Sequence, residues 1–233
     1  MEITFVIASD AVSIPTRANS IHAAMRSLCL HAKSKEVNVP HVRRFVGQKC
    51  YLAIPIPEDA EKWRIWDNNL ELVLPASGSG YRTPATAIYT EGSIPKDVPQ
   101  HFFSIVDLAT DESIGWCKLD RIHPLNRRGD LSIVLGEPGY RGKGYGQDVL
   151  RLLLDVAFNL VNLESVELSV FAFNKHAIEC YKRVGFKEVG RLRHARIVAG
   201  KAHDVVLMDI LASEFDHASS VIRHVVGKEG RPD

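Results

Sequence analysis

The sequence is poor in cysteine and has no long apolar run. Four widely spaced cysteines, none of them in a Cys-x-x-Cys pair, are present: Cys29, Cys50, Cys117 and Cys180. Without a partner cysteine or histidine at ligand spacing, they predict reduced structural thiols and no metal site. The apolar runs all fall short of the roughly 20 residues that a membrane-spanning helix needs. We therefore expect no membrane helix.

A charge of one dominant sign is also lacking. The chain has 29 Lys and Arg against 28 Asp and Glu, a net charge of +1. Such a balance creates no overall field for binding nucleic acid or anionic lipid, so neither is an expected partner. Glu2 stands where a secretory signal would carry positive charge, which predicts a cytoplasmic protein. The 45% of hydrophobic residues is typical of a folded globular chain.

No internal repeat or low-complexity tract divides the 233 residues, which predicts one main domain with extensions. Residues 1–44 differ from the rest and form the expected N-terminal extension. Within it, Ile21, Met25 and Leu28 recur at helical spacing and predict one amphipathic helix. This helix would pack against the domain or a second subunit, or act as a regulatory arm.

The middle of the chain alternates short apolar segments with turn residues. A strand over residues 50–56 should end at its prolines, and a helix should follow with Trp63, Trp66 and Leu70 on one face. The Pro-, Gly- and Ser-rich stretch 75–99 predicts a long loop, and long loops are often functional. Two strands of a hairpin are then expected at residues 102–108 and 114–119.

Residues 130–161 predict a strand, a glycine turn and a helix. In the strand, Asp130, Ser132 and Val134 share one face and the intervening leucine and isoleucine residues share the other. The turn Arg-Gly-Lys-Gly-Tyr-Gly, residues 141–146, directly precedes the helix. Glycines let backbone N–H groups converge at the positive end of a helix, an arrangement suited to binding phosphate.

Two common phosphate motifs do not fit this turn. The dinucleotide fingerprint requires a third glycine where Gln147 stands, and a P-loop requires Lys-Ser or Lys-Thr after its second glycine. The turn instead resembles the acetyl-CoA motif of the GNAT acetyltransferases, Arg/Gln-x-x-Gly-x-Gly/Ala. Arg141, Gly144 and Gly146 match its fixed positions.

A second motif strengthens this resemblance. After a predicted strand at 166–172, Asn174 is placed to cap a helix that Gly185 should end. The pattern Asn174-x-x-Ala177-x-x-x-Tyr181-x-x-x-Gly185-Phe186 is similar to another GNAT segment at its usual distance. The resemblance covers residues 45–212, leaves 213–233 as a tail, and is closest to the ribosomal-protein N-terminal and spermidine N-acetyltransferases. It implies an α/β (α+β) fold, with a mixed, mostly antiparallel central sheet flanked by helices.

The resemblance also implies a cofactor site and a proton donor. The cofactor acetyl-CoA would contact the strand end, the glycine turn and the helix cap, at Val134, Leu135, Gly136, Arg141, Gly142, Lys143, Gly144, Tyr145, Gly146 and Asn174. The residues themselves leave alternatives open, because Arg141 and Lys143 also suit a solvated turn and Asn174 suits a plain helix cap. Tyr181 matches the family's general acid, although its position equally suits a core tyrosine.

The general base is less evident. Asp130 begins the strand before the turn and would border the acceptor pocket, or it is a solvated acid following a basic turn. Glu137 lies on an exposed turn and is the weaker candidate. Six basic residues would contact the adenosine phosphate or form a solvated face: Lys182, Arg183, Lys187, Arg191, Arg193 and Arg196.

These features together predict an N-acetyltransferase. It would move the acetyl group of acetyl-CoA to a primary amine by direct attack in a ternary complex, with a small amine, a polyamine or a protein N-terminus as acceptor. The alternatives are a CoA-binding sensor or scaffold without turnover, and a structural module with an incidental glycine turn. The sequence leaves the oligomeric state open, with a homodimer as one option.

Overall fold

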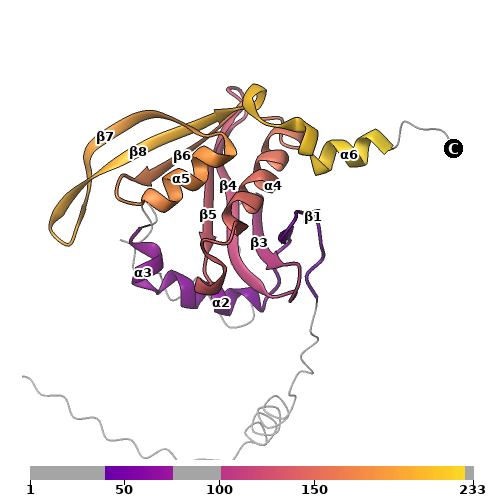
Figure 1. The fold of residues 1–233 in the computed structure, drawn as a ribbon, viewed down its shortest axis with the longest axis horizontal. Coiled ribbons are helices and arrows are strands. Elements are labelled where there is room, and N and C mark those ends of the chain that lie inside the picture. Colours follow the sequence, from indigo (N-terminus) through magenta and orange to yellow (C-terminus); the bar gives the residue numbers. More distant parts are fainter. Residues whose placement is uncertain (1–39, 76–100, 229–233) are drawn as a thin grey trace, which may run out of the picture. The chain divides into compact units, whose positions relative to one another are not determined.

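The computed structural model describes residues 40–75 and 101–228, and from His41 onward these belong to one unit. Its centre is an eight-stranded sheet of order β1-β2-β3-β4-β5-β6-β8-β7 (Figure 1). The strands are β1 Phe45–Val46, β2 Cys50–Ala53, β3 His101–Asp107, β4 Ser113–His123, β5 Arg128–Leu135, β6 Ser165–Phe171, β7 Lys187–Val198 and β8 Lys201–Leu211. Only β5 and β6 pair in parallel within the described sheet, which confirms the predicted mixed, mostly antiparallel architecture.

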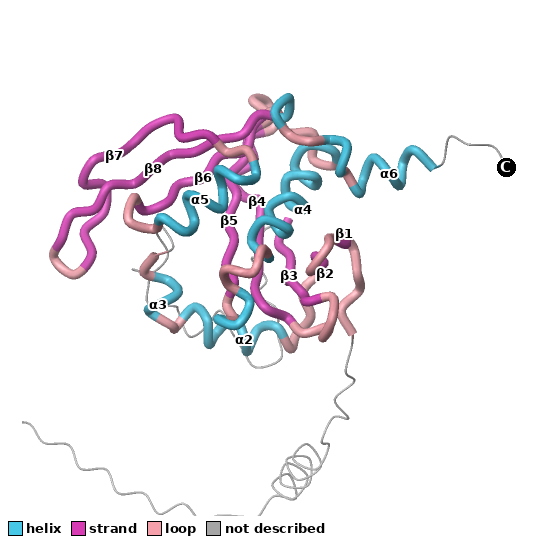
Figure 2. The backbone as a smooth tube through the Cα atoms, viewed as in Figure 1, coloured by secondary structure: helices cyan, strands magenta, loops and turns pink. Residues whose placement is uncertain are grey.

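Helices cover both faces of the sheet (Figure 2). They are α2 Asp59–Asp67, α3 Leu70–Val73, α4 Tyr145–Asn159 and α5 Lys175–Val184, while α6 Val221–Lys228 contacts α4 and extends away from the sheet. On one face Trp63 of α2 packs edge-on against Phe102 of β3, which stacks on Trp116 of β4. The next residue of β4, Cys117, points into the core beneath α4, so α2 and α4 lie on opposite faces.

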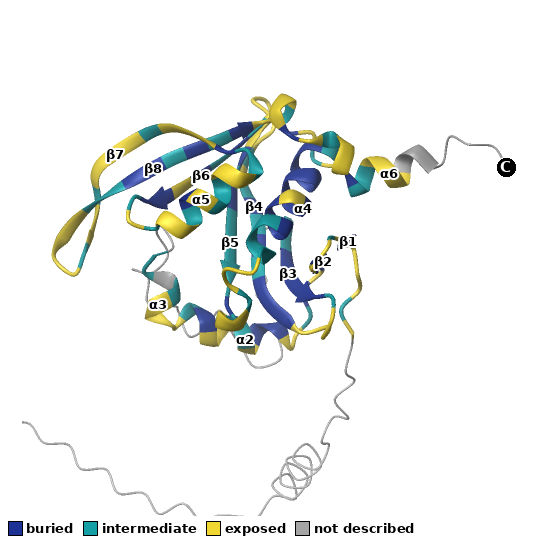
Figure 3. Ribbon diagram, viewed as in Figure 1, coloured by how far each residue is buried: buried dark blue, intermediate teal, exposed yellow. Residues whose placement is uncertain are grey.

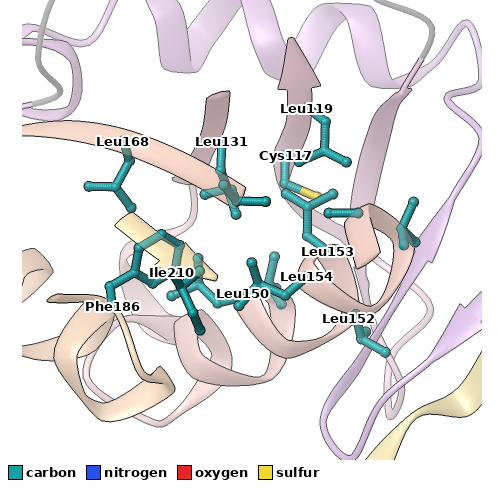
Figure 4. Packing of buried hydrophobic residues seen from close by; sticks show 14 of the residues in the cluster. Cys117, Leu119, Leu131, Leu150, Leu152, Leu153, Leu154, Leu168, Phe186 and Ile210 are labelled. Atoms are coloured by element: carbon teal, nitrogen blue, oxygen red, sulfur yellow. The ribbon is translucent and has the colours of Figure 1, made fainter. Parts of the chain in front are cut away.

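The main core lies between α4 and the sheet (Figures 3 and 4). Val149, Leu153 and Val156 of α4 are fully buried, as their helical spacing predicts. They pack in one cluster with Leu131 of β5 and Leu168 of β6. The burial of Leu131 confirms which face of the predicted strand is apolar, and it places Asp130 on the opposite face, toward α2 and α3.

Two predicted boundaries are wrong. Strand β2 ends at Ala53, and Ile54 is exposed just before Pro55. Leu70 does not continue the face of Trp63 and Trp66, because the side chain of Asn69 accepts a hydrogen bond from the Glu71 N–H and starts a separate helix. The predicted N-terminal helix and nearly all of the predicted 75–99 loop lie outside the described residues, and the domain boundaries stay predictions.

The last two strands extend beyond their neighbour β6. Phe171, the last residue of β6, pairs with Val205, and the Ala172 N–H bonds to the Asp204 carbonyl, so residues 201–203 of β8 pair with β7 only. Figure 1 shows this hairpin extending past β6 on the left. Asp204 stabilises it by accepting a hydrogen bond of 2.9 Å from the His194 N–H.

A buried carboxylate joins the start of α4 to the turn between β1 and β2. Asp148 is only 7% exposed and accepts hydrogen bonds from the N–H groups of Gln48 (3.1 Å), Lys49 (2.8 Å) and Cys50 (3.2 Å). A Cβ on Gly47 would lie 2.6 Å from this carboxylate, so only glycine fits there. The contact fixes the first turn of α4 against a segment far away in the sequence.

Replacing Asp148 with leucine should destabilise the fold by about 3 kcal/mol, because it leaves buried N–H groups without acceptors. Asp148→Asn retains one acceptor oxygen and should lose clearly less stability. Urea denaturation of the two variants and the wild type measures both effects. A loss of under about 0.5 kcal/mol in the leucine variant would show that these hydrogen bonds contribute little.

Candidate active site

A long cleft opens where β5 and β6 run apart. The two strands pair only at Arg128–Asp130 with Ser165–Glu167, although both continue well beyond these residues. The cleft has a volume of about 1390 Å³ and is lined by residues of both strands, among them Val134 and Leu135. Strand β5 is therefore paired with β4 on one side and presents open backbone N–H and C=O groups on the other.

The predicted glycine turn borders this cleft at the N-terminus of α4. Gly142 and Gly144 have φ of 71° and 89°, in the left-handed region that favours glycine. Both line the cleft together with Gly146. A Cβ on Gly146 would lie 3.2 Å from the sulfur of Cys180, so glycine here lets α4 and α5 approach closely. The first N–H groups of α4 lack partners within the helix and suit an anion.

Arg141 lines the cleft, but its guanidinium is hydrogen-bonded to backbone carbonyl groups. Its guanidinium donates hydrogen bonds to the carbonyl oxygens of Leu135 (3.1 Å) and Gly136 (2.8 Å). It therefore ties the glycine turn to the end of β5. Gly136 is buried outside the cleft lining, and its missing side chain has a packing cause, since a Cβ would lie 2.1 Å from the Trp66 ring.

The structure does not bring Lys143 and Tyr145 into the cleft. Lys143 is exposed, and neither residue is part of the lining. The Tyr145 hydroxyl donates a hydrogen bond of 2.6 Å to Asp107, which is the main cause that raises the pKa of Tyr145 to about 12. Tyr145 thus holds the first turn of α4 against β3, on the side away from β6.

Asn174 and Tyr181, the two ends of the second motif, both line the cleft. The Asn174 side chain caps α5 by accepting a hydrogen bond from the Ala177 N–H (3.2 Å), and its amide also donates to the Pro75 carbonyl (3.3 Å). Burial raises the pKa of Tyr181, so its hydroxyl keeps its proton well above neutral pH. This hydroxyl makes no hydrogen bond to any other residue that the structure describes.

Asp130 lies on the cleft wall toward α2 and α3 and is paired. It forms an ion pair with Arg121, which sits at a β-bulge with φ of 48°. Directly opposite on β4 is Asp120, itself paired with Lys118. All four side chains line the cleft. The other candidate base, Glu137, accepts a hydrogen bond from the Trp66 indole (3.2 Å).

Several lining residues were not predicted: Trp116, Lys118, Asp120, Arg121 and Cys180. The first four belong to β4, and their place in the cleft depends on the register with β5. Hairpin pairing could have indicated Asp120, because it faces Asp130 across the strands. Of the six basic residues predicted to contact the adenosine phosphate or form a solvated face, Arg183 and Arg196 line the cleft.

No helix in residues 40–75 and 101–228 is long and apolar enough to cross a membrane. The same residues contain no group of three metal-ligating side chains suited to holding an ion. The open edge of β5 and the glycine turn suit an elongated ligand with phosphates better than a metal ion. The open edge of β5 can pair with an extended polar arm, and the left-handed glycines leave the N–H groups of the turn accessible.

Comparisons with known proteins agree with this geometry. A family model described as "Acetyltransferase (GNAT) domain" matches residues 39–187. The spermidine N(1)-acetyltransferase of Vibrio cholerae is 31% identical over 111 residues, 48% of this chain and 64% of that protein. A solved structure of spermidine N-acetyltransferase from Vibrio cholerae, in complex with CoA and spermine, has a TM-score of 0.62 at 25% identity and covers 71% of this chain and 96% of that one.

Further relatives include a second spermidine acetyltransferase and a putative ribosomal acetyltransferase. The spermidine N(1)-acetyltransferase of Escherichia coli K12 is 30% identical over 104 residues, 45% of this chain and 55% of that protein. A putative ribosomal N-acetyltransferase, YdaF of Bacillus subtilis, is 26% identical over 102 residues, 44% of this chain and 55% of that protein. The chain thus spans less than two thirds of the length of these curated relatives.

Proposed function

The chain belongs to the GNAT acetyltransferase family, whose cofactor is acetyl-CoA, and we propose that it transfers the acetyl group of acetyl-CoA to a primary amine. The observation that carries this proposal is the single cleft shared by the open edge of β5, the Gly142 and Gly144 turn, and Tyr181. Bound acetyl-CoA would supply the activated thioester carbonyl. The residues of this chain would bind and orient acetyl-CoA and would donate a proton to the departing thiolate.

At the cofactor end, the backbone does most of the binding. The backbone groups of β5 near Val134 that face away from β4 would pair with the pantetheine arm as an added strand would, while the Leu135 carbonyl is already bonded to Arg141. The N–H groups of the glycine turn and the positive end of α4 would hold the pyrophosphate. Arg141 acts indirectly, because its hydrogen bonds to the end of β5 fix the position of the turn.

Tyr181 is the proposed general acid. Tyr181 is half-buried at the cleft wall, and its hydroxyl has a raised pKa and no hydrogen-bond partner among the described residues, so it can donate a proton to a departing thiolate. Two turns of α5 separate it from Asn174, which caps that helix. The cap and the Phe186 ring, packed edge-on against Tyr181, support its orientation.

Asp130 is proposed to lie at the acceptor end, on the sheet face toward α2 and α3. Asp130→Asn would remove a negative charge and leave the Arg121 cation without its partner. We expect the KM for a cationic amine to rise on the order of fivefold, with an unchanged Kd for acetyl-CoA. Steady-state kinetics with Glu164→Gln as control, an exposed carboxylate outside the cleft lining, measure this. Equal acceptor KM values in all three proteins would falsify the role.

A thiol-release assay tests the proposed function itself. Spermidine is the acceptor named for several relatives, so polyamines are the first amines to test, followed by small amines and peptides with free N-termini. We expect release of CoA thiol that requires both acetyl-CoA and an amine, and an acetylated product by mass spectrometry. Tight CoA binding with no thiol release across the panel would instead support a CoA-binding sensor.

A further inference from the structure

A lysine far from the glycine turn in sequence lies directly beside it in space. Lys49 belongs to the turn between β1 and β2, and its Cε is 3.3 Å from the position that a Cβ on Gly144 would occupy. Gly144 is the N-cap of α4 and lines the cleft. Lys49 is exposed and lies outside the cleft lining, so its side chain approaches the proposed phosphate site from beside the turn.

The backbone of Lys49 is fixed from both sides. Its N–H donates a 2.8 Å hydrogen bond to the buried carboxylate of Asp148, in the first turns of α4. Its carbonyl accepts a 3.0 Å hydrogen bond from the Leu108 N–H. Because Asp148 belongs to the same helix that Gly144 caps, the lysine is held in a constant position relative to the glycine turn.

The side chain is guided as well. The ammonium of Lys49 lies 5.7 Å from the centroid of the Tyr145 ring, a cation–π contact. That ring is itself held in place by the hydrogen bond from its hydroxyl to Asp107. The lysine stem thus passes along Gly144 and the ammonium lies over the first residue of α4.

This position is electrostatically unfavourable without an anion. The N-terminus of a helix carries partial positive charge, so a cation placed there is repelled. Lys49 forms no ion pair with any carboxylate in the described parts of the chain. Two acids in the neighbouring segments are bonded to other groups, Asp148 to backbone N–H groups and Asp107 to Tyr145 and Thr110. An anion at the turn would remove this repulsion.

We propose that Lys49 binds the pyrophosphate of acetyl-CoA, as a cofactor-binding residue outside both sequence motifs. This inference rests on the proposed function. The glycine turn supplies uncharged N–H donors, and Lys49 adds a full positive charge from the turn between β1 and β2. The hydrogen bonds between Asp148 and the β1–β2 turn then have a functional role, since they place the Lys49 charge beside the site.

Calorimetric titration of Lys49→Met tests the proposal, because methionine keeps the apolar stem and removes the charge. We expect the Kd for CoA to rise about tenfold. The loss should be equal for dephospho-CoA, which keeps the pyrophosphate and lacks the 3′-phosphate. Lys49→Arg should bind within about twofold of the wild type, and so should Lys201→Met, a change at an exposed lysine on the β7–β8 hairpin.

Each other outcome overturns a distinct statement. An unchanged Kd in folded Lys49→Met removes the lysine from the site. A loss seen with CoA but not with dephospho-CoA assigns Lys49 to the 3′-phosphate and contradicts the pyrophosphate contact. Equal losses in the Met and Arg variants point to packing rather than charge. No CoA binding by the wild-type protein would refute the proposed function instead.

Discussion

Replacing Tyr181 with phenylalanine is expected to lower kcat by about a hundred- to ten-thousand-fold, while the Kd for acetyl-CoA stays within about twofold. The substitution removes only the hydroxyl and keeps the ring that packs against Phe186. A proton donor acts in the chemical step, so its loss should appear in kcat. Stopped-flow thiol release measures that step directly.

Tyr140→Phe is the matched control, because it removes a phenol that lies outside the cleft lining. It should leave kcat within about twofold of wild type. The raised pKa of Tyr181 adds a second expectation: the hydroxyl stays protonated as the pH rises, so loss of this acid should not limit kcat between about pH 7 and 10. A Tyr181→Phe enzyme as fast as wild type, with chemistry rate-limiting, would return Tyr181 to a packing role.

Gly144→Asp is expected to weaken acetyl-CoA binding by at least about a hundredfold. It places a carboxylate where the pyrophosphate is proposed to bind, at the N-terminus of α4. The same side chain would crowd Lys49, whose Cε lies 3.3 Å from the new Cβ position. Titration calorimetry with acetyl-CoA measures the change in Kd.

Gly139→Asp provides the control for charge. Gly139 lies in the segment before the turn, its φ is not in the left-handed region, and a Cβ there would meet nothing within 4 Å. It should bind acetyl-CoA within about threefold of wild type. The left-handed φ of Gly144 costs any other residue roughly 1–2 kcal/mol, so circular dichroism must show that Gly144→Asp is folded. A folded variant with wild-type affinity would contradict the phosphate assignment.

The sequence indicates the site best where it is built from neighbouring residues. The strand before the glycine turn, the turn itself and α4 are contiguous, so alternation and helical spacing locate all three. Asn174 and Gly185 mark the ends of α5 for the same reason, since cap residues act on N–H and C=O groups next to them. The fold class follows from the two motifs and is confirmed by the sheet.

Contacts between distant segments are what the sequence does not reveal. The pairing of Asp130 with Arg121 depends on a bulge in β4 that turns the arginine toward the cleft. The basic residue of the motif, Arg141, is next to the phosphate site in sequence, yet its guanidinium is committed to the carbonyls at the end of β5. The cation proposed to act at the turn, Lys49, comes from the distant β1–β2 turn, where its backbone N–H is bonded to Asp148.

The order of strands in the sheet has a consequence for how the protein forms. Neighbours in the sheet follow the chain from β1 to β6, so five successive pairs can assemble as the chain is synthesised. Strand β6 receives its second neighbour only from β8, at residues 201–211. Strand β6, on one side of the cleft, is therefore the last strand of the cleft to be paired on both edges. Cofactor binding can therefore stabilise the chain only after residues 201–211 have paired with β6, because binding stabilises only the completed fold.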